Sequence, residues 1–332
     1  MNHRILELYS GIGGMHCAWK ESGLPGEVAA AVDINTVANE VYKHNFPETK
    51  SLTRNIQTLT KSEIEKLNVD TILMSPPCQP FTRNGKYLDE EDPRTNSLLA
   101  ILQLLEELNC IEYILLENVK GFECSSVRNK FIEALKKCGF EFQEFLLSPS
   151  SIGIPNSRLR YYCTARRTQV PWNYQRTDEI VLTLDRVYPE PDSLENILDP
   201  EAGDEYLLPD KYLKRANCLD ICYKDSKRSC CFTKAYSHYL DGTGSVFTPC
   251  SQEMVESCFK NANTHELGGP DYIKQIKQLK LRFFSPKEVC ALMAFPKKYS
   301  FPKHITRKQC YRLIGNSVNV KVISELLKIL YS

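Results

Sequence analysis

The sequence has no apolar run that approaches the roughly 18 residues that a membrane span needs. It also has no signal-peptide pattern, because Met1-Asn2-His3-Arg4 leads directly into an apolar segment. We therefore expect a cytoplasmic and nuclear protein without a membrane span. The chain has 332 residues, of which 42% are hydrophobic, so it is long enough for one large and one smaller domain.

Metal-binding cysteine motifs are also missing, although the sequence contains 14 cysteines. Cys218 and Cys222 are four positions apart and Cys230 and Cys231 are adjacent, but no second Cys or His pair completes a zinc site. The cysteines are scattered over a long chain, unlike the disulfide framework of a small secreted domain. We expect reduced thiols and no metal ion.

Net charge is nearly absent, at +1, and by itself neither favours nor excludes a nucleic-acid partner. The distribution along the chain is uneven. Residues 1–150 contain 15 Lys and Arg against 21 Asp and Glu, whereas residues 211–332 contain 21 against 9, an excess of +12. This excess favours a face that binds a polyanion over a chance asymmetry of a solvated surface.

The first 165 residues alternate short apolar segments with helical patterns. Because the apolar segments have the length of buried strands and are separated by helices, they predict a doubly wound, mostly parallel α/β sheet covered on both faces. Such sheets bind ligands at the carboxyl ends of their strands. Strands are predicted at residues 5–8, 28–32, 71–74 and 113–116, and helices at 14–21, 36–45, 97–108 and 127–138.

The pattern changes near residue 175. Residues 176–210 are acidic and contain several prolines, and residues 211–282 show weaker periodicity. We interpret this region as the entry into a second, smaller domain. Helical patterns return at 285–295 and from Thr306 to the end of the chain.

Glycines follow the first predicted strand in the segment Tyr9-Ser10-Gly11-Ile12-Gly13-Gly14. They permit a tight turn and a close approach of the backbone to a ligand. His16 occupies the position at which a dinucleotide fingerprint requires a third glycine, so a cofactor without a pyrophosphate fits better. Asp33 ends the second strand, where an acid can bind ribose hydroxyls. A simple strand-to-helix turn would explain the glycines alone equally well.

Cys78 follows two prolines just after the predicted strand 71–74. A lone cysteine is more often a small buried hydrophobic residue than a reactive one. Here the prolines stiffen the backbone, and the end of a parallel strand is a frequent position for catalytic groups. A thiolate is a soft nucleophile suited to attack on an electron-poor ring carbon, which makes Cys78 a candidate nucleophile.

Three charged residues follow on later strands. Glu117 comes after four apolar residues, so it lies either at the mouth of its strand or in a buried position. Near Cys78, partial desolvation would raise its pKa and allow it to carry a proton at neutral pH. Arg158 and Arg160 alternate in a predicted strand and would share one face. Fixed cations there would favour an ionised thiol and bind a phosphate or carbonyl oxygen.

Together these segments resemble the cytosine C5-methyltransferase family and occur in the order of the family's motifs. The resemblance covers residues 4–165 and 283–330 and implies a Rossmann-like class I S-adenosylmethionine methyltransferase fold. A catalytic domain is expected over 1–185 and 283–332, with a target-recognition domain over 186–282. The matching segments are Gly11-Ile12-Gly13-Gly14, Pro77-Cys78-Gln79, Glu117-Asn118-Val119, Arg158-Leu159-Arg160 and Gly315-Asn316-Ser317-Val318, the last expected on a helix that returns to the cofactor.

The resemblance also implies S-adenosyl-L-methionine as cofactor and assigns roles to particular residues. The catalytic residues are Cys78, Glu117, Arg158 and Arg160. Many family members carry an acid at the position of Asn55, whose carbonyl can still accept a hydrogen bond from the adenine amine. The expected cofactor-binding residues are Tyr9, Gly11, Ile12, Gly13, Gly14, Asp33, Ile34, Asn55, Ile56, Pro77, Asn316, Ser317 and Val318.

Within the family, the chain is most similar to the small eukaryotic group that methylates transfer RNA for aspartate. It lacks an N-terminal regulatory region, continues after Cys78 as Pro80-Phe81-Thr82-Arg83, and contains Cys231-Phe232-Thr233, which resembles a signature of that group. The sequence suggests no catalytic role for this tripeptide, and a packing role fits equally well. The group implies a monomer that methylates cytosine 38 in the anticodon loop of tRNA(Asp) and binds DNA weakly at most.

Two alternatives remain open from the sequence. A DNA cytosine-C5 methyltransferase would use the same chemistry. A catalytically silent, nucleic-acid-binding relative is disfavoured because the candidate catalytic residues and the glycines are all present. An RNA methyltransferase of the two-cysteine type is also disfavoured, since Glu117 stands where its second cysteine is expected.

Overall fold

A computed structural model describes residues 2–77 and 95–332, so Cys78 and the segment Pro80-Phe81-Thr82-Arg83 lie outside the described residues. Its main feature is a seven-stranded sheet in the order β3-β2-β1-β4-β5-β7-β6. The first five strands of this order run parallel, and β7 is antiparallel to both of its neighbours. The strands are β1 (His3–Leu8), β2 (Gly26–Asp33), β3 (Lys50–Thr53), β4 (Thr71–Met74), β5 (Tyr113–Val119), β6 (Phe140–Leu147) and β7 (Arg160–Arg167).

Helices cover both faces of this sheet, as the apolar strands predicted. Strand β1 shows the cause, because Ile5 packs into the core on one face while Leu6 and Leu8 pack into the core on the other. The first face is covered by α1 (Gly14–Ser22), α2 (Thr36–Asn45) and α11 (Val320–Leu330). The second is covered by α3 (Lys61–Glu65), α4 (Asn96–Leu105) and α5 (Ser126–Lys137).

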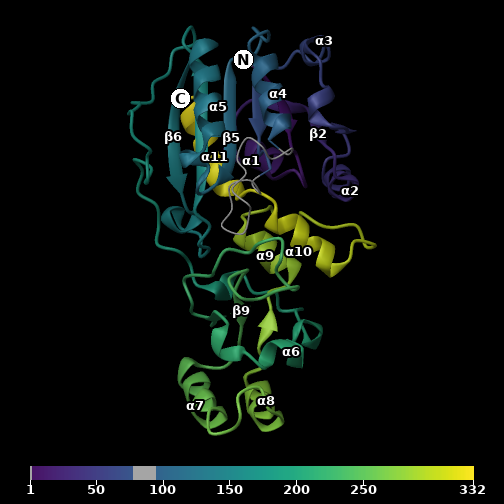
Figure 1. Ribbon diagram of the computed structural model, residues 1–332, viewed down its shortest axis with the longest axis vertical. Coiled ribbons are helices and arrows are strands. Elements are labelled where there is room, and N and C mark those ends of the chain that lie inside the picture. Colours follow the sequence, from purple (N-terminus) through teal and green to yellow (C-terminus); the bar gives the residue numbers. More distant parts are fainter. Residues whose placement is uncertain (1, 78–94) are drawn as a thin grey trace.

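A smaller part of the chain extends from one end of the sheet, and both chain termini lie at the opposite end (Figure 1). It contains a three-stranded sheet in the order β10-β9-β8 and joins the core that α1, α2 and α11 share. Its elements are β8 (Ile221–Cys222), β9 (Val246–Phe247), β10 (Arg282–Phe283), α6 (Asp210–Leu213), α7 (Gln252–Ala262) and α8 (Pro270–Ile276). Helices α9 (Pro286–Leu292) and α10 (Arg307–Gly315) lie between this part and the large sheet (Figure 1).

The expected boundary between residues 282 and 283 falls inside β10, so the returning catalytic segment begins within a strand of the smaller sheet. The thirteen cysteines among the described residues carry free thiols. No helix in the described part of the chain is long and apolar enough to cross a membrane.

Two local predictions were wrong. Residues from Thr306 onward form two helices, because the chain turns at Asn316, after α10, and Asn319 then caps α11 by accepting a hydrogen bond from the Val322 N–H. The motif Gly315-Asn316-Ser317-Val318 therefore forms the turn between helices. Strand β7 begins at Arg160, so strand alternation does not apply to Arg158.

Candidate active site

The glycine segment forms a turn between β1 and α1 at the end of the sheet that faces the smaller part. Tyr9, Gly11 and Gly13 all have positive φ, at 55°, 51° and 82°, and such a conformation is strained for tyrosine. The Asp33 carboxylate fixes this turn, because Oδ2 accepts a hydrogen bond from the Gly11 N–H at 2.8 Å. Its Oδ1 accepts another from the Asn35 N–H, also at 2.8 Å. The end of β2 thus holds the turn in a defined shape.

A cavity of about 650 Å³ opens at the carboxyl ends of β1, β2, β4 and β5. This is the position at which a doubly wound sheet binds its ligand, and the size is typical of a small-molecule site. Most of the sequence-predicted site residues line it: Tyr9, Gly11, Ile12, Gly14, Asp33, Ile34, Asn55, Ile56, Pro77, Glu117, Arg158, Arg160, Asn316, Ser317 and Val318.

Gly13 is not in the lining. It precedes α1, and a side chain there would collide with the ring of Phe46. The sequence reasoning missed several lining residues, and those next to the recognised motifs could have been found from their position. The missed residues are Glu7, Ser10, Met15, Asn35, Ala38, Arg54, Gln57, Ser75, Pro76, Ser97, Val119, Lys234, Leu313 and Gly315.

The turn at the start of α11 approaches the glycine turn closely. A Cβ atom at Gly14 would lie 2.7 Å from Ser317 Oγ and 2.8 Å from Val318 Cγ2. Only glycine allows this approach, so the turn after β1 and the turn before α11 together form one wall of the cavity.

Glu117 lies within β5 and is 8% exposed. Burial raises the pKa of this carboxyl above its ordinary value, and Arg160 and Arg158 offset the shift only partly. The raised pKa agrees with the sequence-based expectation. The next residue, Asn118, donates from its buried amide to the Pro76 carbonyl at 3.4 Å, which ties β5 to the segment that leads to Cys78. The nucleophile prediction for Cys78 itself lies outside the described residues.

Arg160 stands at the start of β7, the strand antiparallel to β5. Its Nε lies 3.7 Å from Glu117 Oε1, and its Nη1 donates to the Leu159 carbonyl at 2.8 Å. Its Nη2 reaches the Cys231 sulfur at 3.6 Å. The guanidinium therefore contacts both an acid of the large sheet and a thiol from the smaller part.

Arg158 is 3% exposed and has a different arrangement. One terminal nitrogen, Nη1, donates to the Phe232 carbonyl at 3.1 Å and to the Cys231 sulfur at 3.6 Å. The other, Nη2, donates to the carbonyls of Gly315 and Ser317, at 3.3 Å and 2.6 Å. Arg158 thus joins the segment that contains Cys231 and Phe232 to the turn between α10 and α11, so both arginines reach Cys231 although only Arg160 lies in the strand.

Asn55 lies at the far side of the cavity and caps the short 3-10 helix η1 (Ile56–Thr58). Its Oδ1 accepts a hydrogen bond from the Gln57 N–H at 3.0 Å. An amide oxygen has two lone pairs, so the capped carbonyl retains the capacity to accept one more hydrogen bond, as from an adenine amine.

The sheet order, with its one antiparallel strand and a glycine turn after β1, defines a class I methyltransferase fold. The buried acid beside Arg160, next to the Pro76-Pro77 segment, has the arrangement that the resemblance to cytosine C5-methyltransferases predicts.

Comparison with known proteins supports this class. The family model described as C-5 cytosine-specific DNA methylase matches residues 3–332. The tRNA (cytosine(38)-C(5))-methyltransferase of Spodoptera frugiperda is 64% identical over 331 residues, 100% of both chains. The Homo sapiens protein of the same name is 43% identical over 99% of both chains. The crystal structure of a triple mutant of Spodoptera frugiperda DNMT2 superposes with a TM-score of 0.95, at 63% identity and 100% coverage of both chains.

The chain belongs to the C-5 cytosine-specific DNA methylase family and, within it, to the DNMT2-type group of cytosine-C5 methyltransferases. One further relative carries a different name. The DNA (cytosine-5)-methyltransferase of Dictyostelium discoideum is 38% identical over 99% of this chain and 94% of its own.

Proposed function

We propose that this enzyme transfers a methyl group from S-adenosyl-L-methionine to C5 of cytosine 38 in the anticodon loop of tRNA(Asp). The observation that carries the chemistry is the buried Glu117 carboxyl, with its raised pKa, held beside Arg160 in the cavity. The relatives named tRNA (cytosine(38)-C(5))-methyltransferase support the substrate, because they match this chain over almost its entire length.

The cavity has features that fit the cofactor. The Ser10 hydroxyl is buried in its wall and has no hydrogen-bond partner among the described residues, so it can bind a polar ligand. Ile34 is 68% exposed beside it, which suits contact with an adenine ring. The turn Gly11–Gly14, Asp33 and Asn55 would hold the methionine, ribose and adenine parts. When bound there, S-adenosylmethionine supplies an electrophilic methyl group.

The residues of the chain would activate the cytosine. In this proposal the Cys78 thiolate adds to C6 of the ring, and the protonated Glu117 donates to N3 and accepts from the exocyclic amine. Electron density then rises at C5, which takes the methyl group. Loss of the C5 proton and departure of Cys78 restore the aromatic ring. Arg160 would bind the base carbonyl, while Arg158 holds the surrounding segments.

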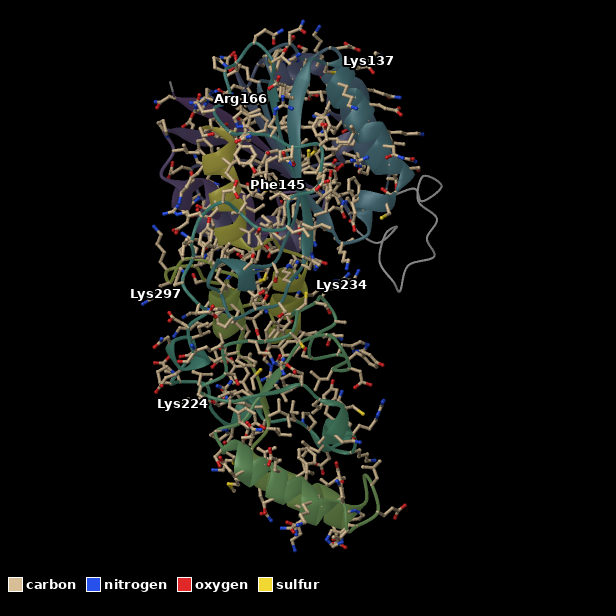
Figure 2. The ribbon with its side chains drawn as sticks, turned by 90° about the vertical axis from the view of Figure 1, so that its left-hand side faces the viewer. Lys137, Phe145, Arg166, Lys224, Lys234 and Lys297 are labelled. Atoms are coloured by element: carbon tan, nitrogen blue, oxygen red, sulfur yellow. The ribbon has the colours of Figure 1, made fainter. Side chains whose placement is uncertain are left out.

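RNA is a suitable partner for this site. A base must leave its stack to enter the cavity, and an anticodon loop lowers that cost because its bases are single-stranded. Lys234 brings a cation from the smaller part into the cavity wall, at the level where the two parts meet (Figure 2). Together with the +12 excess of residues 211–332, it favours binding of a phosphate backbone and a strong dependence of affinity on salt.

The second candidate is DNA methylation, which the Dictyostelium discoideum relative favours. A transfer assay with tritiated S-adenosylmethionine should compare tRNA(Asp), the same tRNA with cytosine 38 replaced by uracil, and duplex DNA. We expect label only in the tRNA(Asp) that retains cytosine 38, and bisulfite sequencing should place the methyl group at that position. Preferential labelling of DNA would overturn the RNA assignment.

The nucleophile is tested with Cys78→Ala. This variant should lose methyl transfer to tRNA while it binds S-adenosylmethionine with wild-type affinity in calorimetry, because the cofactor contacts come from other residues. Undiminished turnover would remove Cys78 from the mechanism. A wild-type chain that binds cofactor and tRNA but labels neither nucleic acid would instead support the catalytically silent relative.

A further inference from the structure

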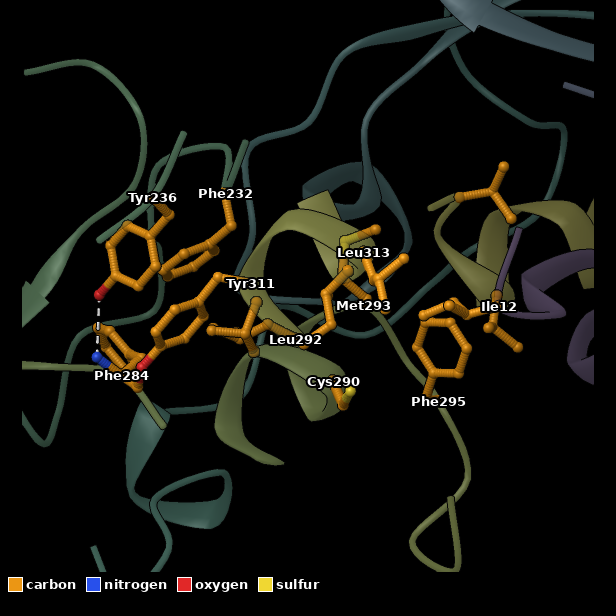
Figure 3. Packing of buried hydrophobic residues seen from close by; sticks show 14 of the residues in the cluster. Ile12, Phe232, Tyr236, Phe284, Cys290, Leu292, Met293, Phe295, Tyr311 and Leu313 are labelled. Carbon is orange, nitrogen blue, oxygen red and sulfur yellow. Dashed lines mark hydrogen bonds between the residues drawn. The ribbon is translucent and has the colours of Figure 1, made fainter. Parts of the chain in front are cut away.

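The segment from Cys231 to Lys234 reaches from the smaller part into the active site, and its backbone is fixed on two sides. Phe232 is buried and packs edge-on against Tyr236 and Phe284, with ring centroids 4.9 Å and 5.5 Å away (Figure 3). On the other side, Thr233 rests directly on Gly315, where a Cβ atom would lie 2.5 Å from the Thr233 carbonyl oxygen. Cys231 therefore has a well-defined position relative to the cavity.

The Cys231 sulfur lies between the two arginines of the site. It is 3.6 Å from Nη1 of Arg158 and 3.6 Å from Nη2 of Arg160. The Arg160 guanidinium also faces Glu117, with Nε 3.7 Å from Oε1. Cys231, Arg160 and Glu117 thus form a chain of contacts in which the thiol and the acid both contact one cation.

The charge on the Cys231 sulfur affects the protonation of Glu117. Burial acts to raise the pKa of the Cys231 thiol, but Arg158 and Arg160 outweigh it and lower the pKa below its ordinary value. Among the described residues, the charged and titratable groups that act on the sulfur include these two arginines and Tyr162, whose pKa burial raises, so the phenol stays neutral. A thiolate balances part of the positive charge that would otherwise promote ionisation of Glu117.

We propose that Cys231 is a positioning residue for methyl transfer: as a thiolate it holds the Arg160 guanidinium beside Glu117 and thereby helps Glu117 to retain its proton. The inference deepens the proposed function and depends on it. It also gives the Cys231-Phe232-Thr233 tripeptide a physical role, in which Phe232 anchors the segment and Cys231 acts on the site.

The test compares Cys231→Ala and Cys231→Ser with Cys230→Ala as the matched control. Neither cysteine is part of the cavity lining, but the Cys230 thiol lies beside Asp220, whereas the Cys231 thiol contacts Arg158 and Arg160. Because a hydrogen bond to a charged group is lost, we expect kcat of Cys231→Ala to fall roughly tenfold to hundredfold, with KM for tRNA within about twofold. The control should retain wild-type kcat.

Two further measurements separate positioning from simple packing. The wild-type kcat should decline as pH falls through the lowered Cys231 pKa, and Cys231→Ser should lack that part of the decline, since a hydroxyl does not titrate there. Any decline that belongs to the Cys78 thiolate is common to both enzymes. In an Arg160→Lys background, Cys231→Ala should add less than about twofold, because the thiol acts through Arg160.

The proposal is overturned if Cys231→Ala matches the control, if its effect is fully additive with Arg160→Lys, or if Cys231→Ser reproduces the wild-type pH profile. Should Cys231→Ala unfold, the serine variant and its pH profile still decide. Failure of the wild-type enzyme to label tRNA would instead contradict the proposed function, so the two failures are distinguishable.

Discussion

Replacement of Gly315 by alanine tests how closely the segment from Cys231 to Lys234 must approach the active site. Gly315 is the last residue of α10, and an added Cβ would lie 2.2 Å from the Thr233 carbonyl carbon and 2.3 Å from the Lys234 nitrogen. Ordinary van der Waals contact begins at 3.4 Å, so the two backbones must separate by roughly 1 Å or slightly more. Such overpacking costs about 1–3 kcal/mol, and at the last residue of a helix the gain in helix propensity is smaller than the roughly 1 kcal/mol of a helix interior.

The expected net loss of stability is therefore about 1–3 kcal/mol, less than the total stability of a typical domain, so the protein should stay folded. Activity should change much more. Arg158 and Cys231 link the displaced segment to Arg160, and a misplacement of about 1 Å in an active site can lower the rate roughly hundredfold. Urea unfolding and kcat/KM for tRNA methylation, measured on the same preparation, separate the two effects.

Gly23→Ala is the matched control. Gly23 has φ +72° at the C-terminal end of α1, and a Cβ there would have no atom within 4 Å. Its alanine variant should lose about 1 kcal/mol through backbone strain alone and keep wild-type kcat/KM. A Gly315→Ala enzyme with the activity of this control would refute the argument that contact between Gly315 and Thr233 positions the site.

Three further variants test the buried charged groups. Glu117→Gln should lower kcat by about 10²–10⁴, because glutamine cannot share a proton with the base. Wild-type activity should decline as pH rises through the raised Glu117 pKa, and this decline should be absent from the pH profile of Glu117→Gln. Burial raises the pKa of Glu7 from 4.5 to about 8, so the folded state retains a proton that the unfolded state releases and wild-type stability should fall as pH rises between these values. Glu7→Gln should flatten that dependence in urea unfolding, and an unchanged slope would assign it to other groups. Arg158→Lys should leave at least one buried carbonyl of Phe232, Gly315 or Ser317 unpaired, at a cost of about 1–3 kcal/mol in urea unfolding, whereas wild-type stability would argue against the linking role.

The elements with strong local signals could be predicted from the sequence. The α2 prediction matches its bounds because Asn35 caps the helix and its apolar residues repeat at helical spacing. The β4 prediction is equally close, since three apolar residues follow the buried Thr71 and a proline pair comes one residue after the strand. Strand β3 (Lys50–Thr53) was not predicted, because it lies at the sheet edge and carries polar residues. Helices α7 and α8 were missed because the polar segment around them masks short buried stripes.

The candidate site shows the same division between local and long-range information. The raised pKa of Glu117 could be expected because the acid follows an apolar run in the same strand. No local pattern indicates that Arg158 binds carbonyls 74, 157 and 159 positions away in the chain. These contacts arise only when the smaller part packs against α10, and the packing of Phe232 against Tyr236 and Phe284 fixes that arrangement.

The position of Arg158 predicts that binding of S-adenosylmethionine and binding of tRNA affect each other. Its guanidinium holds the segment that carries Lys234 toward the substrate and also the turn at Ser317 that lines the cofactor cavity. A displacement of either segment therefore stretches hydrogen bonds to the other. Since buried hydrogen bonds to a charged group contribute about 1.5–3 kcal/mol, occupancy of one site should change affinity at the other, and by linkage the change must be reciprocal. Calorimetric titration of S-adenosylmethionine with and without tRNA measures this coupling directly, and identical affinities in both titrations would show that Arg158 joins the segments without coupling them.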